Sequence, residues 1–411
     1  MFFKVKTSEE VFQILKDFHP TEDEVLSIDK ALYRILNKDI IAPEDLPGFP
    51  RSSMDGYAVQ ARDTFGATES LPVLLEVVGE VLMGQPSNVS VRPGQAVRIS
   101  TGGMLPQGAD GVVMLEYCHS LDERNIEVGR AVSPLENVLR FDDDYKAGTV
   151  VLRSHHSIRS QDVGILAGLG ITEISVFKQP RVAIISTGDE VVPIDQRPLP
   201  GQIRDINSYT LNAFCLQQRA EPIMLGLCRD DFKKLRQLVE NGLHIADTVW
   251  ISGGSSVGTR DMTLKVFESF DKMELLVHGI SISPGKPTII ARIGQKAVFG
   301  LPGHVASAMV VAEVFLSPFL ARLSGKKDMT KEALFEVDAE LSRNLESASG
   351  RDDYVRVRLI EKQERLIAEP IFGKSGLIST LVEAHGLIKI DRNTEGLYQG
   401  QHVKVMVFDR V

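Results

Sequence analysis

Residues 248–263, TVWISGGSSVGTRDMT, have the types and spacing that most clearly suggest chemistry. A run suited to a buried strand leads into a loop with Gly253, Gly254 and Gly258, and a helical pattern follows over residues 262–270. A glycine-rich turn before a helix directs free backbone N–H groups and the positive end of the helix dipole to one point. The stretch therefore predicts a cradle for an anion such as a phosphate.

Asp261 stands at the mouth of this predicted cradle. Its carboxylate would repel a bare phosphate unless a metal ion or a proton lay between them, so the pairing suggests a phosphate bound with a divalent cation. Glycine-rich turns also occur where a chain simply reverses, and an aspartate near a helix start is often a cap. Both interpretations are open on this stretch alone.

The elements that would position these residues alternate between strand and helix from residue 180 to residue 323. This alternation predicts βαβ crossovers and a mainly parallel sheet, whose carboxyl strand ends meet at one edge. The segments expected at that edge are 186–190, 229–231, 253–261, 283–287 and 301–304. Because all of them are polar or glycine-rich, a ligand site is favoured over unrelated loops.

Four carboxylates in these segments offer the oxygen ligands that Mg²⁺ prefers: Asp189, Glu190, Asp230 and Asp261. Asp230 could instead cap the helix that follows it, and Glu190 could be a surface charge. Lys286 is the candidate phosphate-binding cation, although loop lysines are more often solvated. His304 has no serine or cysteine at a recognisable triad spacing, so no catalytic triad is predicted.

The rest of the chain has a different texture. Helical periodicity covers residues 8–37 with a break at Pro20, and a proline-rich stretch near 43–53 marks a domain boundary. Short alternating strands over residues 57–138 predict a small inserted β domain, and similar strands after residue 325 predict a small barrel. Asp55 and Thr101 stand in singular loops of the inserted domain, where each could serve a site or only form a turn.

The composition excludes several classes of function. The 46 Lys plus Arg against 55 Asp plus Glu give a formal charge of −9, which leaves no global field for nucleic acid or an anionic membrane. The three cysteines have no CxxC or Cys/His spacing, which favours a reducing, cytoplasmic location and no zinc site. The apolar run 305–323 contains Glu313, Pro318 and Arg322 and is interpreted as a buried helix. The residues alone thus predict an Mg²⁺-dependent enzyme for a phosphorylated or nucleotide-like ligand.

At these residues the sequence resembles the molybdopterin molybdenumtransferases, the MoeA family, which is related to the E domain of gephyrin. The motifs that carry the resemblance occur in the family's order and spacing over nearly the whole chain: LPGFPRSSMDGYAV, RISTGGMLPQGADGVVMLE, STGDEVV with GQIRDIN, RDD, ISGGSSVGTRDMT, PGKP and FGLPGHVASA.

The resemblance implies a fold of four parts, with a central, mostly parallel three-layer α/β domain of the molybdopterin-binding type. The expected parts are an elongated linking and dimerisation domain (1–45 with 140–178), an inserted β domain carrying MDGYA (46–139), the α/β domain (179–325) and a C-terminal β-barrel (326–411).

The implied activity is insertion of molybdate into adenylylated molybdopterin with Mg²⁺-dependent release of AMP, which gives molybdenum cofactor. The implied partners are a second copy of the chain, in a homodimer with a shared active site, and molybdopterin adenylyltransferase and acceptor molybdoenzymes. Nucleic acid and membrane are not expected partners. A non-catalytic molybdopterin-binding or scaffold protein and a tungstate-preferring homologue are the alternatives.

Residue roles follow from the resemblance by position. Asp189, Glu190, Asp230 and Asp261 would hold Mg²⁺ and the phosphate region of the pterin, and Asp55 and Thr101 would reach in from the β domain. The expected substrate-binding residues are Thr101, Gly253, Gly254, Ser255, Lys286, Pro302, Ser307 and Ser375, with Pro302, Ser307 and Ser375 near the molybdate.

Some positions depart from the family's common pattern. Ser283 and Gly279 stand where lysines are common, His304-Val305 replaces Asn-Pro, and Leu139 stands where the family has Arg in an Asn-Ile-Arg segment, with Arg140 next. Because several of these positions belong to the expected pocket, they leave open how the oxyanion is held and whether molybdate or tungstate is preferred.

Overall fold

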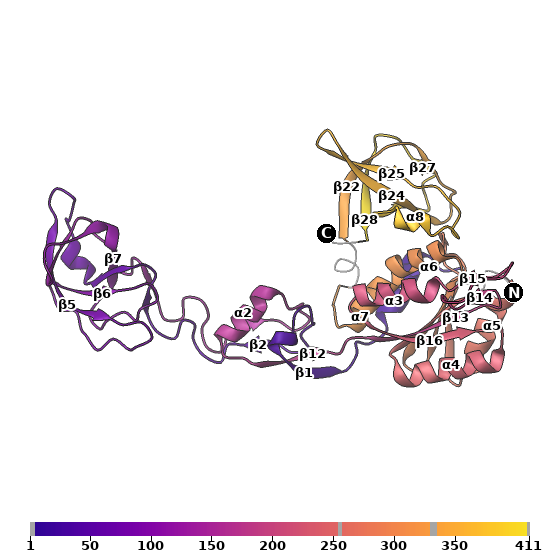
Figure 1. Ribbon diagram of the computed structural model, residues 1–411, viewed down its shortest axis with the longest axis horizontal. Coiled ribbons are helices and arrows are strands. Elements are labelled where there is room, and N and C mark those ends of the chain that lie inside the picture. Colours follow the sequence, from indigo (N-terminus) through magenta and orange to yellow (C-terminus); the bar gives the residue numbers. More distant parts are fainter. Residues whose placement is uncertain (1–4, 254–256, 329–334, 409–411) are drawn as a thin grey trace.

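The computed structural model describes residues 5–253, 257–328 and 335–408, with residues 257–261 described by their backbone alone. The molecule is elongated (Figure 1). The chain starts at the large end, runs out along a thin arm to a small β domain, and returns to build the α/β domain and the C-terminal domain. The small β domain therefore lies far from the α/β domain of the same chain (Figure 1).

The arm is built from two separate segments of the chain. Strand β1 pairs antiparallel with β12, and β2 pairs with β11, around a core of Leu36, Ile158, Leu166 and Val176. The N-terminal segment and the arm contain α1 (Ser8–Lys16), β1 (Asp23–Ser27), η1 (Ile28–Lys30), β2 (Ile40–Ile41), β11 (Val150–Leu152), α2 (Ser160–Gly168) and β12 (Glu173–Phe177).

The first predicted helix is confirmed as α1, with a capping box between Thr7 and Glu10. The helical continuation predicted after Pro20 is wrong, because residues 23–27 form strand β1. Val25 is 65% exposed and pairs with Ser175 of β12, so pairing with a distant strand overrides the local helical spacing.

The small β domain contains a six-stranded sheet in the order β7-β4-β6-β5-β9-β8. Hydrophobic clusters cover both faces of the sheet, one around Leu75 and Ile126 and the other around Val97 and Val112. The elements are β3 (Arg51–Ser52), β4 (Gly56–Val59), η2 (Ala61–Thr64), β5 (Val73–Val81), β6 (Gln95–Ile99), β7 (Gly111–Met114), η3 (Leu115–Tyr117), β8 (Cys118–Ser120), β9 (Asn125–Val128) and β10 (Val138–Leu139).

The α/β domain is a three-layer structure around a six-stranded sheet in the order β16-β13-β17-β21-β20-β18. Strands β16, β13, β17 and β21 are parallel, whereas β20 is antiparallel to both of its neighbours, which confirms the mostly parallel sheet. Alternate residues of β13 enter different cores: Val182 and Ile184 pack with α3 and α7, and Ala183 and Ile185 pack with α4 and α5. This alternation is expected for a strand that is buried on both faces.

The elements of this domain are β13 (Arg181–Thr187), β14 (Val191–Val192), β15 (Ile203–Arg204), α3 (Asn207–Gln217), β16 (Glu221–Cys228), α4 (Phe232–Ile245), β17 (Thr248–Gly253), α5 (Val257–Glu268), β18 (Met273–His278), β19 (Ile282–Ser283), β20 (Ile289–Ile293), β21 (Lys296–Pro302), α6 (Val305–Val311), the π-helical turn η4 (Ala312–Leu316) and α7 (Ser317–Leu323).

The apolar segment Val305–Leu323 is the one stretch of the described residues that is long and apolar enough to cross a membrane, with a mean hydropathy of 1.5. Within the fold, 83% of its most apolar window is buried. Phe315, Phe319 and Leu320 pack in the same core as Trp250 and Phe299 of the sheet. These contacts are those of a core helix, as predicted.

The C-terminal domain is a closed five-stranded barrel, because β24-β25-β22-β28-β26 form a chain of pairings that β26 closes on β24. This confirms the predicted barrel. Its elements are β22 (Phe335–Leu341), β23 (Leu345–Glu346), β24 (Asp352–Lys362), β25 (Arg365–Pro370), α8 (Ser379–Val382), β26 (Gly386–Ile390), β27 (Gly396–Leu397) and β28 (His402–Val407). Strand β24 also pairs with β19 of the α/β domain, which docks the barrel beside the carboxyl ends of the sheet strands.

Candidate active site

Two adjoining cavities lie where the parallel strands of the α/β domain end. The first has a volume of about 210 Å³ and the second of about 320 Å³, and Gly303 and His304 line both. The first is lined by the ends of β13 and β17, by residues 203–207 and by Gly376 of the barrel domain. The second is lined by residues 282–287, Pro302, Ser307, Arg351 and Ser375. The predicted edge of the sheet is therefore hollow and is partly closed by the barrel.

Unsatisfied oxygens lie in the wall of the first cavity. Ser252 at the end of β17 is fully buried, and neither its Oγ nor the Oδ1 of Asn207 has a hydrogen-bond partner among the described residues. The Asn207 Nδ2 donates to the carbonyl of Gly303 at 2.8 Å, which fixes the side chain in place. A buried polar group without a partner costs roughly 1–3 kcal/mol, so these two oxygens favour a polar ligand in the cavity.

The glycine predicted to begin the cradle lines the first cavity. A Cβ on Gly253 would lie 1.6 Å from Thr187 Oγ1, so the ends of β13 and β17 can approach only with glycine here. Gly254 and Ser255 lie outside the described residues, and their predicted role stays a prediction. The backbone of Asp261 belongs to α5, while its side chain also lies outside the description.

Three of the four predicted carboxylates face one another beside this cavity. The backbone N–H of Asp230 donates to Asp189 Oδ1 at 3.2 Å, and Glu190 lines the cavity. Burial, together with the negative charges of Asp189 and Glu190, raises the pKa of Asp230. The repulsion among these side chains would fall if a cation joined them.

The capping role considered for Asp230 belongs to its neighbour. Asp231 is the N-cap of α4, where its Oδ1 accepts from the N–H groups of Lys233 and Lys234 at 2.9 and 3.1 Å. Asp230 is therefore available to a ligand. Within the described residues, however, no group of three or more His, Cys, Asp and Glu side chains is arranged to hold a metal ion. A metal site here would need a further ligand, such as a substrate oxygen or the side chain of Asp261.

The second cavity brings together four residues that were predicted to bind substrate, Lys286, Pro302, Ser307 and Ser375, and adds Arg351. Arg351 Nε also forms an ion pair with Asp353 Oδ1 at 2.9 Å. The described lining contains two cations, several hydroxyls and no carboxylate. Such a lining suits a small oxyanion.

A buried arginine holds the barrel loop that carries Ser375. Arg356 of β24 donates to the carbonyl of Gly373 at 2.9 Å and to Thr380 Oγ1 at 2.7 Å, at the two sides of this loop. It is 8% exposed and has no carboxylate partner among the described residues, and burial lowers its pKa. The backbone of Ser375 in turn accepts from the N–H of Ala306 at 3.0 Å. Arg356 thus positions the loop against the first turn of α6.

Asp55 and Thr101 do not join this cluster within one chain. Asp55 Oδ1 accepts from the N–H and the Oγ1 of Thr101 at 2.7 and 3.0 Å, and these hydrogen bonds lower the pKa of the carboxyl. The pair lies in the small β domain, at the far end of the arm from the sheet edge (Figure 1).

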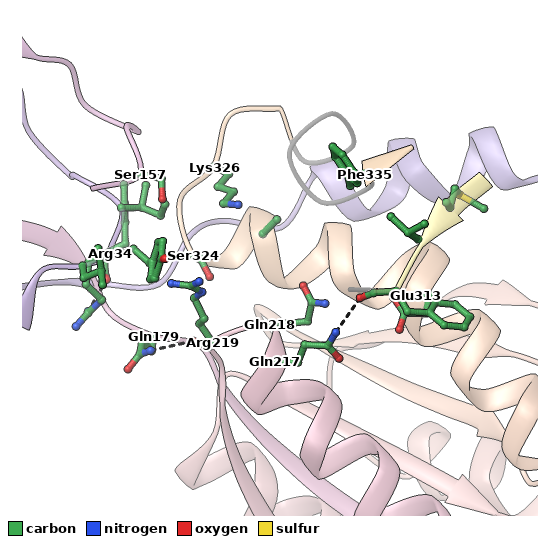
Figure 2. A pocket seen from close by; sticks show the side chains of 18 of the residues that line it. Arg34, Ser157, Gln179, Gln217, Gln218, Arg219, Glu313, Ser324, Lys326 and Phe335 are labelled. Carbon is green, nitrogen blue, oxygen red and sulfur yellow. Dashed lines mark hydrogen bonds between the residues drawn. The ribbon is translucent and has the colours of Figure 1, made fainter. Parts of the chain in front are cut away.

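A larger cavity lies elsewhere, where the arm, the α/β domain and the barrel meet (Figure 2). It has a volume of about 430 Å³. Arg219 stacks 3.3 Å over the ring of Tyr33, Gln179 Nε2 donates to the Arg219 carbonyl at 3.0 Å, and Gln217 Nε2 donates to the Phe408 carbonyl at 2.8 Å. None of the predicted site residues lines this cavity.

Comparison with known families accounts for most of the chain. Residues 6–170 match the MoeA N-terminal region (domain I and II), residues 183–322 match the "Probable molybdopterin binding domain" and residues 338–408 match the MoeA C-terminal region (domain IV). A molybdopterin biosynthesis protein of Methanocaldococcus jannaschii is 36% identical over 406 residues, which cover 96% of this chain and 95% of that protein. This chain belongs to the MoeA family.

Two further MoeA relatives are similar to this chain over nearly its full length. The molybdopterin molybdenumtransferase of Haemophilus influenzae is 33% identical over 95% of both chains. A crystal structure of a MoeA protein from Pyrococcus horikosii superposes with a TM-score of 0.84 at 35% identity, over 99% of this chain and 100% of that one. As a MoeA family member, the protein is a transferase of molybdenum cofactor biosynthesis.

Sequence reasoning missed several residues of this MoeA site. Arg351 stands in a polar turn of the barrel region, and only the β19–β24 pairing brings it to the second cavity. Ser252 and Asn207, whose oxygens lack partners in the first cavity, were not among the predicted site residues either. The GQIRDIN motif around residues 201–207 was a usable signal for Asn207, because a polar segment at a strand end belongs to the expected edge.

Proposed function

We propose that this protein inserts molybdate into adenylylated molybdopterin with release of AMP. The observation that carries the proposal is the pair of adjoining cavities at one sheet edge, one bordered by carboxylates and unsatisfied buried oxygens and the other lined by cations and hydroxyls. A nucleotide-linked pterin phosphate and a free oxyanion would need two neighbouring sites of these kinds. Family membership supports the same assignment.

The first cavity would hold the phosphate region of the pterin. Because Gly253 has no Cβ, the ends of β13 and β17 pack closely in the wall of this cavity, and the N-terminal end of α5 follows Gly253 in the chain. Ser252 Oγ can donate to a phosphate oxygen, whereas Asn207 Oδ1 can accept from an N–H or O–H of the ligand. In this proposal Gly254 and Ser255 complete the cradle.

The second cavity would hold molybdate. Lys286 and Arg351 supply positive charge, and Ser307, Ser375 and Ser283 supply hydroxyl donors. The cavity shares a wall with the first, so an oxyanion bound in it lies next to the pterin. Holding the two reactants side by side is the main contribution that such a site makes to the rate.

Asp189, Glu190, Asp230 and Asp261 are the residues proposed to hold Mg²⁺. The raised pKa of Asp230 fits this role, because burial and then the negative charges of Asp189 and Glu190 disfavour the ionised carboxyl, and a bound cation would compensate that charge. When bound, Mg²⁺ would offset the charge of the phosphoanhydride.

The chemistry requires two exchanges. Molybdate gives up oxygen as water and gains the two dithiolene sulfurs, whose protons leave with that water, so the metal keeps its oxidation state. One P–O bond of the phosphoanhydride breaks, water supplies the oxygen that completes the cleaved phosphate, and AMP leaves. The protein would position the groups and stabilise the charge.

We further propose that the active site is completed by a second copy of the chain. The small β domain that carries Asp55 and Thr101 lies too far from the sheet edge of its own chain for the pair to reach it (Figure 1), and hydrogen bonds from Thr101 lower the pKa of the Asp55 carboxyl. A homodimer in which the arm of one protomer reaches the sheet edge of its partner would use this pair.

The direct test is to mix the purified protein with adenylylated molybdopterin, molybdate and Mg²⁺ and to measure AMP by chromatography. We expect AMP release that needs all three, and a loss of release in Asp261→Asn. No release from the wild-type protein, or full release from Asp261→Asn, would contradict the proposal.

Mixing two inactive variants tests the shared site. If Asp55→Ala and Asp230→Ala break opposite halves of one site, a heterodimer has one intact site and one doubly broken site. Random exchange of subunits should then restore about a quarter of the wild-type activity. Failure of any mixture to recover activity, in samples that do exchange subunits, would argue for a site within one chain.

A further inference from the structure

His304 occupies the boundary between the two cavities. It is the N-cap of α6, but its side chain makes no capping hydrogen bond. Its Nδ1 instead lies 2.9 Å from Ser375 Oγ, and the residue is exposed to both cavities. The imidazole therefore contacts the hydroxyl that the proposed function assigns to the oxyanion.

Hydrogen bonds to the segments on both sides position the contact between His304 and Ser375. Asn207 Nδ2 binds the carbonyl of Gly303, the N–H of Ala306 binds the carbonyl of Ser375, and Arg356 fixes the loop behind Ser375. The ring and the hydroxyl thus belong to different domains, and the hydrogen bonds around them keep them in contact. Through this contact, the protonation of the ring can set the direction in which the Ser375 hydroxyl donates.

The direction of this hydrogen bond decides what Ser375 can offer. A hydroxyl has one donor. If Nδ1 is unprotonated, Ser375 donates to the ring, and its hydroxyl has no proton left for an oxyanion. If Nδ1 carries a proton, the ring donates to Ser375 Oγ, and the hydroxyl proton is available to an anion in the second cavity. In the imidazolium form the Nε2–H is a second donor, with a positive charge.

We propose that His304 is a binding residue for the oxyanion substrate, and that its protonation directs the Ser375 hydroxyl toward that substrate. This inference rests on the proposed function of the second cavity. It assigns a role to His304, at a position where the family commonly has asparagine. Ser283, which lines the same cavity, stands where the family commonly has lysine. The imidazolium is the form that binds, because its Nδ1–H leaves the Ser375 proton to the anion and its positive charge attracts the anion as well, so anion binding takes up a proton wherever the free ring is neutral.

Charged groups of both signs line the two cavities that meet at the ring. Lys286 and Arg351 line the second cavity, and Glu190, Asp205 and Arg204 line the first. A bound dianion in the second cavity adds negative charge next to the ring and shifts the balance toward the imidazolium. Proton uptake and anion binding are thus linked.

The test is calorimetric titration of the full-length protein with molybdate alone, at about pH 6.5 and about pH 8.5, in two buffers of different ionisation enthalpy. We expect proton uptake on binding, and an affinity that is about three- to tenfold weaker at the higher pH. In His304→Asn the side-chain amide can still reach Ser375 but cannot titrate. That variant should show no proton uptake and a flat pH dependence.

Two outcomes would overturn the inference: binding of molybdate to the wild type without proton uptake, or the same pH dependence in His304→Asn. Circular dichroism of the variant excludes misfolding as a cause. The AMP assay separates this inference from the proposed function. Absent AMP release from the wild type removes the function, whereas AMP release with an unchanged pH profile of the KM for molybdate in His304→Asn removes the role of His304 alone.

Discussion

The cavity at the junction of the three domains and the two cavities at the sheet edge differ in how their polar groups are satisfied. The junction cavity is larger, at about 430 Å³ against about 210 and 320 Å³. Around it, Gln217 and Gln179 donate to backbone carbonyls (Figure 2). Arg34 pairs with Glu24, and Lys178 pairs with Glu22. At the sheet edge, buried Ser252 and Asn207 oxygens have no partner among the described residues.

The difference shows that size is a poor guide to function in this molecule. At the junction, the polar side chains Gln179, Gln217, Arg34 and Lys178 all have partners within the protein. At the sheet edge, the polar groups that lack partners and the carboxylates that repel one another carry an energetic cost, which a ligand can remove. The predictions below use this contrast.

The largest expected effect is at Asp230. Asp230→Asn should lower AMP release by about 100-fold or more, because the site loses a cation ligand. Asp231→Ala is the matched control: it removes the α4 cap and should cost about 1 kcal/mol of stability while most activity stays. Equal loss of activity in both variants, measured by AMP release at saturating Mg²⁺, would mean that the helix start matters and not the carboxylate.

The same residue predicts a pH dependence of stability. The pKa of Asp230 is raised in the folded protein, so its ionised form destabilises the fold above that pKa, and the penalty disappears as the pH falls and the carboxyl binds a proton. Without metal, Asp230→Asn should therefore unfold at higher denaturant concentration than the wild type at neutral pH, and this advantage should vanish in acid. A wild type that is more stable than the variant at neutral pH would contradict the like-charge explanation.

Gly253→Ala should perturb the sheet edge next most strongly. Its Cβ would lie 1.6 Å from Thr187 Oγ1, so we expect about 1–3 kcal/mol of destabilisation and a higher KM for the pterin substrate. Thr187→Ala should rescue the double variant in part. Gly164→Ala on α2, where a Cβ meets nothing within 4 Å, is the control and should leave both quantities near wild type. Denaturant unfolding and steady-state kinetics measure them.

Arg356→Met tests the contribution of the barrel to the sheet edge. Loss of its hydrogen bonds to Gly373 and Thr380 should cost about 1–3 kcal/mol and raise the KM for molybdate, because the Ser375 loop loses its anchor. Arg358→Met, two residues along the same strand, removes exposed ion pairs with Glu383 and Glu369 and should cost less than about 1 kcal/mol. An unchanged KM for molybdate in Arg356→Met would show that the anchoring of the Ser375 loop by Arg356 does not contribute to molybdate binding.

The smallest effect is expected in the junction cavity. Arg219→Ala removes a cation–π contact with Tyr33 and should cost about 0.5–1 kcal/mol of stability, with AMP release close to that of the wild type. A loss of activity as large as that of Asp230→Asn would break the contrast between the two regions, because the junction would then take part in function.

Local sequence patterns predicted the correct element where the residues of one segment suffice to determine its secondary structure. The apolar run 248–252 is a buried strand, and the helix expected after Asp230 is present as α4, because its apolar residues repeat at helical spacing and Asp231 caps it. The prediction for residues 23–30 was wrong, because β1 is formed by pairing with β12, about 150 residues away in the chain. A spacing rule cannot report a partner strand.

The site divides in the same way. Strand-end reasoning found Asp189, Glu190 and Asp230, because a parallel sheet must gather its carboxyl ends at one edge. It could not find Arg351 or the role of His304, because both depend on how the barrel docks through β19 and β24. Asp55 and Thr101 were found through the family's motif, and no local rule placed them on a distant arm.

The sequence by itself determined the family, the order of the domains and the chemistry available at the sheet edge, because those follow from residue types in fixed local order. The tertiary structure alone decided which side chains meet. It placed Ser375 against His304, left Ser252 buried without a partner and carried Asp55 to the far end of the arm. Contacts between segments far apart in the chain depend on packing and domain docking, which no local pattern encodes.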